Sequence, residues 1–209
     1  SFHTNKKRII AFKNAFHGRT SAAVAATDNS KINAPLNKQQ EVAFLPFNDI
    51  SAIERELSKG DVCAVIFEAI QGVGGLDEPK EEFVYAMEKL CEKYKSCLIA
   101  DEVQSGFGRS GTFFAFQKYN INPHVITIAK GMGNGFPIGG ILVHPDIKAS
   151  YGMLGTTFGG NHLACKASLA VLDILKKEHL QEKTKSLELY FRKKGAKINQ
   201  IKKIKGRGL

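Results

Sequence analysis

The sequence predicts an α/β fold with a mostly parallel sheet and flanking helices. Three short apolar runs, rich in Val and Ile, each end in a polar residue: residues 62–67 before Glu68, residues 97–100 before Asp101, and residues 125–129 before Lys130. Apolar runs of this length are typical of strands buried on both faces, which is usual in parallel sheets. Helical periodicity between the first two runs completes a βαβ unit.

The remaining elements can be assigned in chain order. Residues 82–94 have apolar side chains at helical spacing and are expected to form the first crossover helix. The Phe-rich residues 112–119 form a short second crossover, also expected to be helical. Residues 139–143 are a fourth strand whose orientation stays open. A long helix is expected after Asn161, and an amphipathic pattern continues through residues 187–198.

Composition excludes several classes of protein. The chain has 209 residues, of which 43% are hydrophobic and 24% charged, and this ordinary usage argues against disorder and coiled coils. No run reaches the roughly 18 apolar residues of a membrane span, and no signal peptide is recognisable, so we expect a cytoplasmic protein without a membrane partner.

The formal charge of +10 is concentrated at one end of the chain. Residues 176–209 hold twelve Lys or Arg against three Asp or Glu, whereas residues 1–175 are nearly neutral. A basic nucleic-acid-binding module is therefore one hypothesis, and it predicts affinity that falls steeply with salt. A basic amphipathic stretch is more often the outer helix of a domain, so no nucleic-acid partner is expected and this hypothesis stays a remote alternative.

The four cysteines give no sign of a metal site. Cys63, Cys91, Cys97 and Cys165 include no C-x-x-C pair and no His at zinc-finger spacing. Two of them lie in apolar runs, where a free thiol behaves as a small hydrophobe. We expect reduced thiols and no metal.

One glycine motif suggests a nucleotide site and fails a second criterion. Residues 106–111 read Gly-Phe-Gly-Arg-Ser-Gly, which matches G-x-G-x-x-G. A dinucleotide site also needs an acidic residue about 20 positions later, and none follows Glu102 before Asp146. The motif is therefore interpreted as a loop with turn glycines.

Asp101 and Lys130 are the candidate chemical groups. Both follow buried strands, and ligands of open α/β sheets bind beyond the carboxyl ends of the strands. A carboxylate at such an edge needs a cationic partner, which is either another side chain or the protonated ring nitrogen of a pyridine cofactor. A lysine desolvated at the same edge, flanked by glycines, can form a Schiff base.

Five ordered motifs carry a resemblance to a known family. They are Phe16-His-Gly-Arg19, Glu68-Ala-Ile-Gln-Gly72, Asp101-Glu-Val-Gln104, Lys130, and Gly155-Thr-Thr-Phe-Gly-Gly-Asn161. Together they resemble the class III pyridoxal-phosphate-dependent aminotransferases across essentially the whole chain. The resemblance implies the large domain of a fold-type I enzyme, with a mostly parallel seven-stranded sheet, and a homodimer with shared active sites.

The resemblance also implies a set of cofactor-binding residues: Phe16, Asp101, Val103, Gln104, Lys130 and Thr157. Lys130 is the catalytic lysine, which binds pyridoxal 5'-phosphate covalently and moves the proton, while Asp101 pairs with the pyridine nitrogen. Val103 and Phe16 pack on opposite faces of the ring, and Gln104 reaches its phenolic oxygen. For Phe16, a plain core aromatic is the alternative.

Further roles concern the substrate and the neighbouring subunit. The resemblance places Arg19 on the substrate α-carboxylate, Thr156 near the substrate, and Thr157 on the cofactor phosphate of the neighbouring subunit. His17 and Glu68 are supporting groups. The expected reaction moves the δ-amino group of N-acetylornithine to 2-oxoglutarate in arginine biosynthesis. Ornithine, succinylornithine and succinyldiaminopimelate stay open as donors, and the aminomutase and decarboxylase branches are less favoured.

The sequence departs from the family pattern in three places. Val73 stands where the family has a Glu that engages a substrate-binding arginine, which bears on the choice of substrate. Ala69 and His162 stand where prolines are usual. The chain is expected to be an internal fragment, inactive alone, with residues 1–175 as the cofactor-binding large domain lacking its N-terminal part. Residues 176–209 are a basic helical segment that leads into a small domain.

Overall fold

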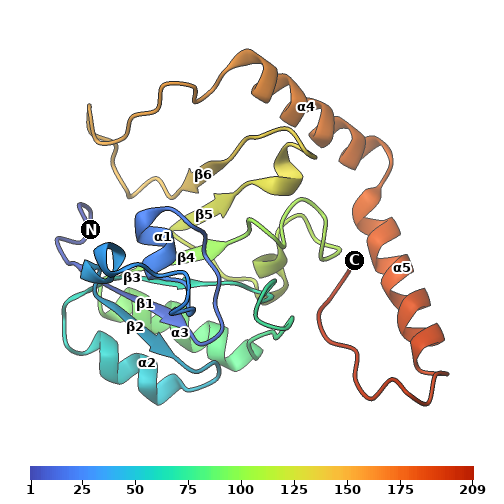
Figure 1. Ribbon diagram of the computed structural model, residues 1–209, viewed down its shortest axis with the longest axis horizontal. Coiled ribbons are helices and arrows are strands. Elements are labelled where there is room, and N and C mark those ends of the chain that lie inside the picture. Colours follow the sequence, from blue (N-terminus) through green and yellow to red (C-terminus); the bar gives the residue numbers. More distant parts are fainter.

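A computed structural model describes residues 1–209 and contains one six-stranded sheet with helices against it (Figure 1). The strands, in the spatial order β2-β1-β3-β4-β5-β6, are β2 Val42–Leu45, β1 Arg8–Phe12, β3 Val62–Phe67, β4 Cys97–Asp101, β5 Val125–Ile128 and β6 Gly140–Val143. The first five are parallel, and β6 runs antiparallel to β5, with Val143 opposite Val125.

The predicted α/β class and mostly parallel sheet are confirmed. The runs that end before Glu68, Asp101 and Lys130 form β3, β4 and β5, and the strand of open orientation is the antiparallel edge strand β6. The sheet has six strands, one fewer than the resemblance implies. Strands β1 and β2 were not predicted, although the run Arg-Ile-Ile-Ala-Phe of β1 has the same apolar character.

Two helices cover one face of the sheet. Helix α2 (Ile50–Leu57) begins at Asp49, whose side chain accepts a hydrogen bond from the Ala52 amide at 2.9 Å, as an N-cap does. Helix α3 (Glu81–Lys93) has two glutamates in its first turn, where the helix dipole favours negative charge. The helix predicted over residues 82–94 is therefore confirmed as α3.

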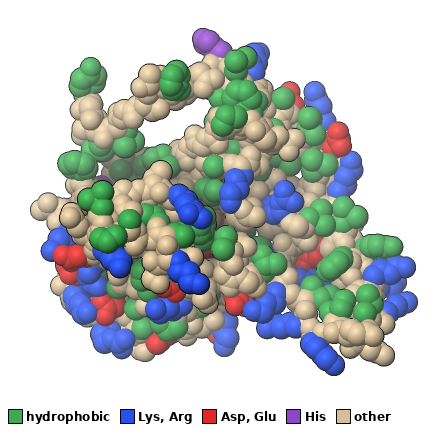
Figure 2. Space-filling view, viewed as in Figure 1, with side chains coloured by type: hydrophobic (Ala, Val, Ile, Leu, Met, Phe, Trp, Pro, Cys, Tyr) green, Lys and Arg blue, Asp and Glu red, His purple; other side chains and the backbone are tan.

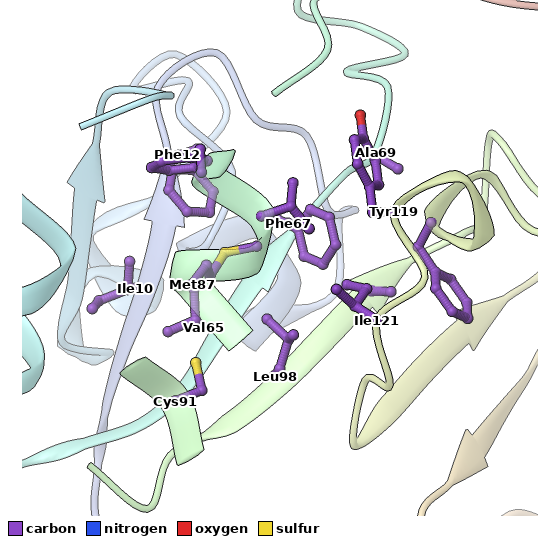
Figure 3. Packing of buried hydrophobic residues seen from close by; sticks show 14 of the residues in the cluster. Ile10, Phe12, Val65, Phe67, Ala69, Met87, Cys91, Leu98, Tyr119 and Ile121 are labelled. Atoms are coloured by element: carbon purple, nitrogen blue, oxygen red, sulfur yellow. The ribbon is translucent and has the colours of Figure 1, made fainter. Parts of the chain in front are cut away.

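The main core lies between these helices and the sheet (Figure 3). Phe12 and Phe67 project from β1 and β3 and are fully buried, and Met87 of α3 packs with them. The rings of Phe12 and Phe83 meet edge to face with centroids 5.7 Å apart, a favourable aromatic geometry. This packing holds the carboxyl ends of the strands in fixed positions.

The second crossover is helical over only part of the predicted range 112–119. The structure has a 3-10 helix, η2 (Ala115–Tyr119), after an irregular segment. Tyr119 is fully buried, and its hydroxyl donates to the carbonyl oxygen of Pro79 at 3.1 Å. Aromatic rings crowd the segment before this helix, where the Phe113 and Phe114 centroids lie 4.7 Å apart.

The opposite face has a lighter cover. It carries the short helix α1 (Ser21–Ala25) and the 3-10 helix η1 (Pro35–Gln39), together with a small buried cluster of Cys63, Ala64 and Cys97. All four cysteines are free. No group of His, Cys, Asp or Glu side chains is placed to hold a metal ion.

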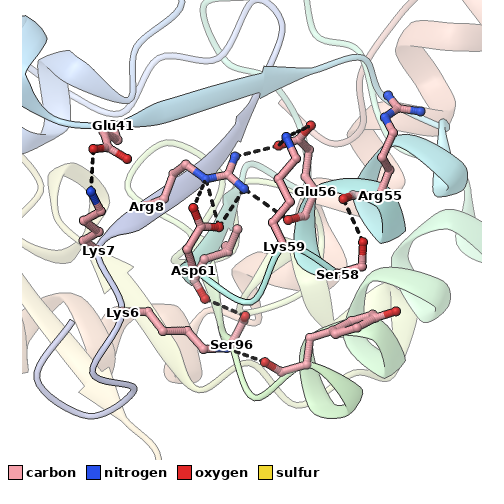
Figure 4. A network of polar contacts seen from close by, with 12 residues as sticks. Lys6, Lys7, Arg8, Glu41, Arg55, Glu56, Ser58, Lys59, Asp61 and Ser96 are labelled. Carbon is pink, nitrogen blue, oxygen red and sulfur yellow. Dashed lines mark hydrogen bonds and ion pairs between the residues drawn. The ribbon is translucent and has the colours of Figure 1, made fainter.

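An ion-pair network closes the amino-terminal edge of the sheet (Figure 4). The Arg8 guanidinium donates to Glu56 at 2.6 Å and to Asp61 at 2.8 Å, and its side chain is largely buried. The hydrogen bond from Arg8 lowers the pKa of the Asp61 carboxyl. The network ties β1 to the segment between α2 and β3.

The C-terminal part extends away from the sheet (Figure 1). A short 3-10 helix, η3 (Lys130–Met132), follows β5, and the helices α4 (His162–Lys177) and α5 (Leu180–Gly195) follow β6. Apolar side chains lie on the surface over α5 (Figure 2), among them Leu189 and Phe191. The domain boundary predicted after residue 175 lies inside α4. None of the helices has the length and apolar character needed to cross a bilayer.

The chain returns to the main body after α5. Lys205 forms an ion pair with Asp77 at 2.7 Å, and Arg207 forms one with Glu78 at 3.3 Å. The amide of Leu209 donates to the Arg109 carbonyl oxygen at 3.1 Å. Part of the terminal basic charge therefore pairs with acidic residues of this chain.

Candidate active site

A cavity of about 140 Å³ lies where the carboxyl ends of β1, β3, β4 and β5 meet. Asp101, the last residue of β4, lines it together with residues from the segments that follow the strands: Phe16, His17, Gly18, Glu68, Gly72, Val73, Val103, Gln104 and Lys130. The chain reverses its direction of travel across the sheet between β1 and β3. Such switch points are the usual ligand sites of open α/β sheets.

Asp101 ends β4 and lies at the buried side of the cavity. Its Oδ1 accepts hydrogen bonds from the Thr127 hydroxyl at 3.0 Å and the Val103 amide at 3.2 Å, and its Oδ2 lies 2.7 Å from His17 Nδ1. Thr127 is directly opposite Asp101 in the β4–β5 register. These partners fix the carboxylate in one orientation.

His17 is the closest partner of Asp101 and is buried, with its side chain 1% exposed. Its backbone amide donates to the Thr27 hydroxyl at 2.9 Å, which holds the loop after β1 in place. The other ring nitrogen, Nε2, is buried without a hydrogen-bond partner in the protein. Buried polar atoms normally have partners, so this nitrogen marks a place where a bound polar group fits.

Lys130 lies at the exposed side of the same cavity. Its Nζ donates a hydrogen bond to Gln104 Oε1, so the residues after β4 and β5 meet there. The backbone of Lys130 is left-handed, with a φ of 44°. Such a conformation is unfavourable for a residue with a side chain, and functional sites often contain one.

Glu68 connects two loops beneath the cavity. One carboxylate oxygen accepts the Phe16 amide and the other accepts the Gly72 amide, both at 3.0 Å. Burial raises the pKa of this carboxyl. Gly72 is needed where it stands, because a Cβ there would lie 2.5 Å from Cγ of Gln104. Glu68 thereby holds the loops that carry Phe16 and Val73.

The structure brings five of the predicted site residues together. Phe16, Asp101, Val103, Gln104 and Lys130 all line the cavity. The supporting residues His17 and Glu68 line it too, and each bonds to a member of this group or its backbone.

The other predicted residues lie outside the cavity. Arg19 is exposed in the loop before α1, and Thr156 and Thr157 are exposed in the long segment between β6 and α4 (Figure 1). Sequence analysis missed Thr127, the hydrogen-bond donor to Asp101. It could have been noticed in the sequence as the only hydroxyl-bearing residue of the apolar strand Val-Ile-Thr-Ile.

Comparisons with known proteins agree on one family. The sequence model of the family "Aminotransferase class-III" matches residues 1–209. Acetylornithine aminotransferase of Methanosarcina acetivorans is 36% identical over 99% of this chain and 53% of its own length. Succinylornithine transaminase of Photorhabdus laumondii is 41% identical over 98% of this chain and 52% of its own. The chain thus spans about half the length of these curated relatives.

Solved structures extend the likeness to the fold. The crystal structure of ornithine aminotransferase from Toxoplasma gondii superimposes with a TM-score of 0.90 at 29% identity, covering 98% of this chain and 51% of that one. A second structure of that enzyme is described with partial occupancy of PLP at its active site. The chain belongs to the class III aminotransferases, whose cofactor is pyridoxal 5'-phosphate.

Proposed function

We propose that the full-length protein is an aminotransferase that moves the δ-amino group of N-acetylornithine to 2-oxoglutarate. The observation that carries the proposal is the cavity itself, with the buried carboxylate of Asp101 on one side and the amine of Lys130 on the other. Similarity to an acetylornithine aminotransferase supports the donor. Similarity to a succinylornithine transaminase keeps that donor as an alternative, beside ornithine and succinyldiaminopimelate.

The residues present suit the ring of pyridoxal phosphate. Asp101 is held by three partners and offers a carboxylate to the ring nitrogen, which it keeps protonated. Val103 and Phe16 supply apolar surface for the two ring faces. Gln104, already bonded to the lysine amine, supplies an amide for the phenolic oxygen.

Lys130 is the residue proposed to hold the cofactor covalently. When bound, pyridoxal phosphate supplies a protonated ring that stabilises negative charge at the substrate carbon that loses a proton. Lys130 Nζ would take that proton as a general base and later return one as a general acid. Gln104 holds the Nζ atom at the exposed side of the cavity between these transfers.

The exposed residues are proposed to act across a homodimer. Thr157 binds the cofactor phosphate of the neighbouring subunit, and Thr156 lies near its substrate. Their exposure in this single chain is consistent with such a role. Arg19 offers the substrate α-carboxylate a planar guanidinium with two parallel donors.

Val73 bears on the choice of amino donor. It lies on the rim of the cavity and is 67% exposed. An apolar side chain there cannot form an ion pair with an arginine. A substrate-binding arginine at this rim would therefore stay free to bind the carboxylate of a substrate. We therefore expect Val73→Glu to lower the affinity for 2-oxoglutarate more than that for the amino donor.

Steady-state kinetics test the donor assignment. The full-length enzyme, loaded with pyridoxal phosphate, is compared on acetylornithine, succinylornithine, ornithine and succinyldiaminopimelate, with 2-oxoglutarate as acceptor. The proposal predicts the highest kcat/KM with acetylornithine. Equal values for acetylornithine and ornithine, or a higher value for any other donor, would refute the assignment.

A further inference from the structure

Glu102 stands between the cavity residues and does not line the cavity. Its neighbours Asp101, Val103 and Gln104 all do. The side chain of Glu102 points into the protein instead, and the residue is 1% exposed. A fully buried carboxylate is costly unless hydrogen bonds satisfy it. The hydrogen-bond partners of the Glu102 carboxylate therefore indicate the role of this residue.

The carboxylate accepts three hydrogen bonds from one returning segment. Oε2 accepts the Ser105 hydroxyl at 2.8 Å and the Ala115 amide at 2.9 Å, and Oε1 accepts the Phe116 amide at 2.8 Å. The backbone carbonyl of Glu102 accepts the Gly106 amide at 3.0 Å. Glu102 thus binds both ends of the loop formed by residues 105–116.

Every partner of the carboxylate is a donor. Burial raises the pKa of Glu102, while the hydrogen bonds from Ala115 and Phe116 oppose that shift. A carboxylate suits the three donors because both of its oxygens accept. An amide does not, since its NH₂ group would face a donor. The site therefore distinguishes Glu from Gln at this position.

The loop held by Glu102 leads to the lysine. Phe107, within the loop, lies against the turn after β5, where a Cβ on Gly131 would approach its Cβ to 3.2 Å. Gln104, the residue directly before the loop, accepts a hydrogen bond from Lys130 Nζ. One contact from the loop and one from the residue directly before it therefore reach the residues around Nζ.

We propose that Glu102 is a positioning residue that fixes Gln104 and Lys130 in their cofactor-binding arrangement by anchoring residues 105–116 behind the cavity. The inference rests on the proposed role of Lys130 and adds a residue that touches neither substrate nor cofactor. Glu102 acts on the cavity only through the loop of residues 105–116. Its role therefore depends on both carboxylate oxygens accepting hydrogen bonds from that loop.

Three variants of the full-length protein test this role. Glu102→Gln keeps the size of the side chain and loses one acceptor. Ser105→Ala removes one donor to the same carboxylate. Ser96→Ala is the matched control, because Ser96 is equally buried at the other end of β4 and donates its hydroxyl to the Val62 carbonyl at 2.7 Å. For each we measure the pyridoxal phosphate Kd and the pH titration of the visible absorbance of the bound cofactor.

We expect Glu102→Gln to raise the cofactor Kd about tenfold, the equivalent of one hydrogen bond to a charged group, and to shift the absorbance titration. Ser105→Ala should move both readouts in the same direction by less. Ser96→Ala should destabilise the fold without moving either. If Glu102→Gln leaves both readouts at wild-type values, the inference is overturned. If Glu102→Gln does not fold, the same two measurements on Ser105→Ala test the inference, and wild-type values for both would overturn it. Failure of the wild-type protein to bind pyridoxal phosphate would instead overturn the proposed function.

Discussion

The two halves of the molecule differ in how their elements are held. From β1 to η3 most strands and helices contribute to a main core of 23 buried residues, and the cavity lies at its edge. From β6 onward, buried positions are confined to α4 and α5, and all four residues of β6 are exposed. In the packed half, from β1 to η3, contacts between residues far apart in the sequence position the functional side chains. In the outer half, from β6 onward, the helices are stabilised by contacts between residues close in the sequence.

Local signals explain why α4 and α5 are helical. Asn161 caps α4 by accepting the Ala164 amide at 3.0 Å. In α5, Glu188 and Arg192 form an ion pair one turn apart at 2.8 Å. Neither contact requires the sheet. The comparison predicts that equivalent substitutions have larger effects in the packed half.

The largest difference is expected for apolar truncations. Phe67→Ala opens a cavity in the core and should lower the free energy of unfolding by about 3–5 kcal/mol. Leu169→Ala removes a side chain that is 56% exposed on α4 and should cost less than about 0.5 kcal/mol. Chemical denaturation of the full-length variants measures both. Similar losses would show that α4 is packed as tightly as the core.

Ion pairs should follow the same order at smaller size. Arg8→Ala leaves Glu56 and Asp61 without their shared partner and should cost about 2–3 kcal/mol. Lys183→Ala removes an exposed pair with Glu178 and should cost about 0–0.5 kcal/mol. Adding salt should reduce only the second value. The comparison fails if the two costs are equal at low salt.

Two threonine hydroxyls allow effects on cofactor binding to be separated from effects on stability. Thr127→Val removes a hydrogen bond to the charged Asp101 and should weaken pyridoxal phosphate binding by about 1.5 kcal/mol, roughly tenfold in Kd. Thr184→Val is the control, because its hydroxyl donates to the Leu180 carbonyl within α5. Its cofactor Kd should match the wild type. Absorbance titration decides, and equal Kd values for the two variants would contradict the role of Thr127.

The smallest expected effect is a pH dependence at the amino-terminal edge of the sheet. His124 Nδ1 accepts the Leu98 amide at 3.1 Å. Burial, followed by the nearby His144 and His3, lowers the pKa of His124, and Asp146 and Glu92 oppose this. The unfolded state therefore binds the proton more readily, and stability falls as the pH drops below about 6.5.

Protonation removes the acceptor, and one partly solvated hydrogen bond is worth about 0.5–1 kcal/mol. His124→Asn keeps an acceptor that does not titrate. Its unfolding free energy should therefore change less than that of the wild type between pH 7.5 and 5.5. Parallel pH profiles for the two proteins would rule out His124 as the source.

Sequence patterns predicted the elements whose signals are local. Apolar runs located β3, β4 and β5, and helical spacing located α3 within one residue at each end. The same patterns left out β1 and β2, although these strands, with five and four residues, are as long as β4 and β5. The crossover before β5 is helical only over Ala115–Tyr119, and the predicted range before it is an irregular segment with crowded aromatic rings.

The candidate site was predictable where a polar residue directly follows a buried strand. Asp101 and Lys130 have that signal in the sequence. The contact of His17 with Asp101 joins residues 84 positions apart and depends on the parallel pairing of β1 with β3 and β3 with β4. No local pattern reports it. The roles of Arg19, Thr156 and Thr157 stay predictions because they require a second subunit or a substrate. The division of the chain after residue 175 also stays a prediction.

The most direct test of the proposed active site is to identify the lysine that binds the cofactor. The full-length protein is loaded with pyridoxal phosphate, reduced with borohydride, digested and analysed by mass spectrometry. We expect the added phosphopyridoxyl mass on Lys130 and none on Lys130→Ala. A modified lysine elsewhere, or equal modification of Lys130→Ala, would show that Lys130 does not hold the cofactor.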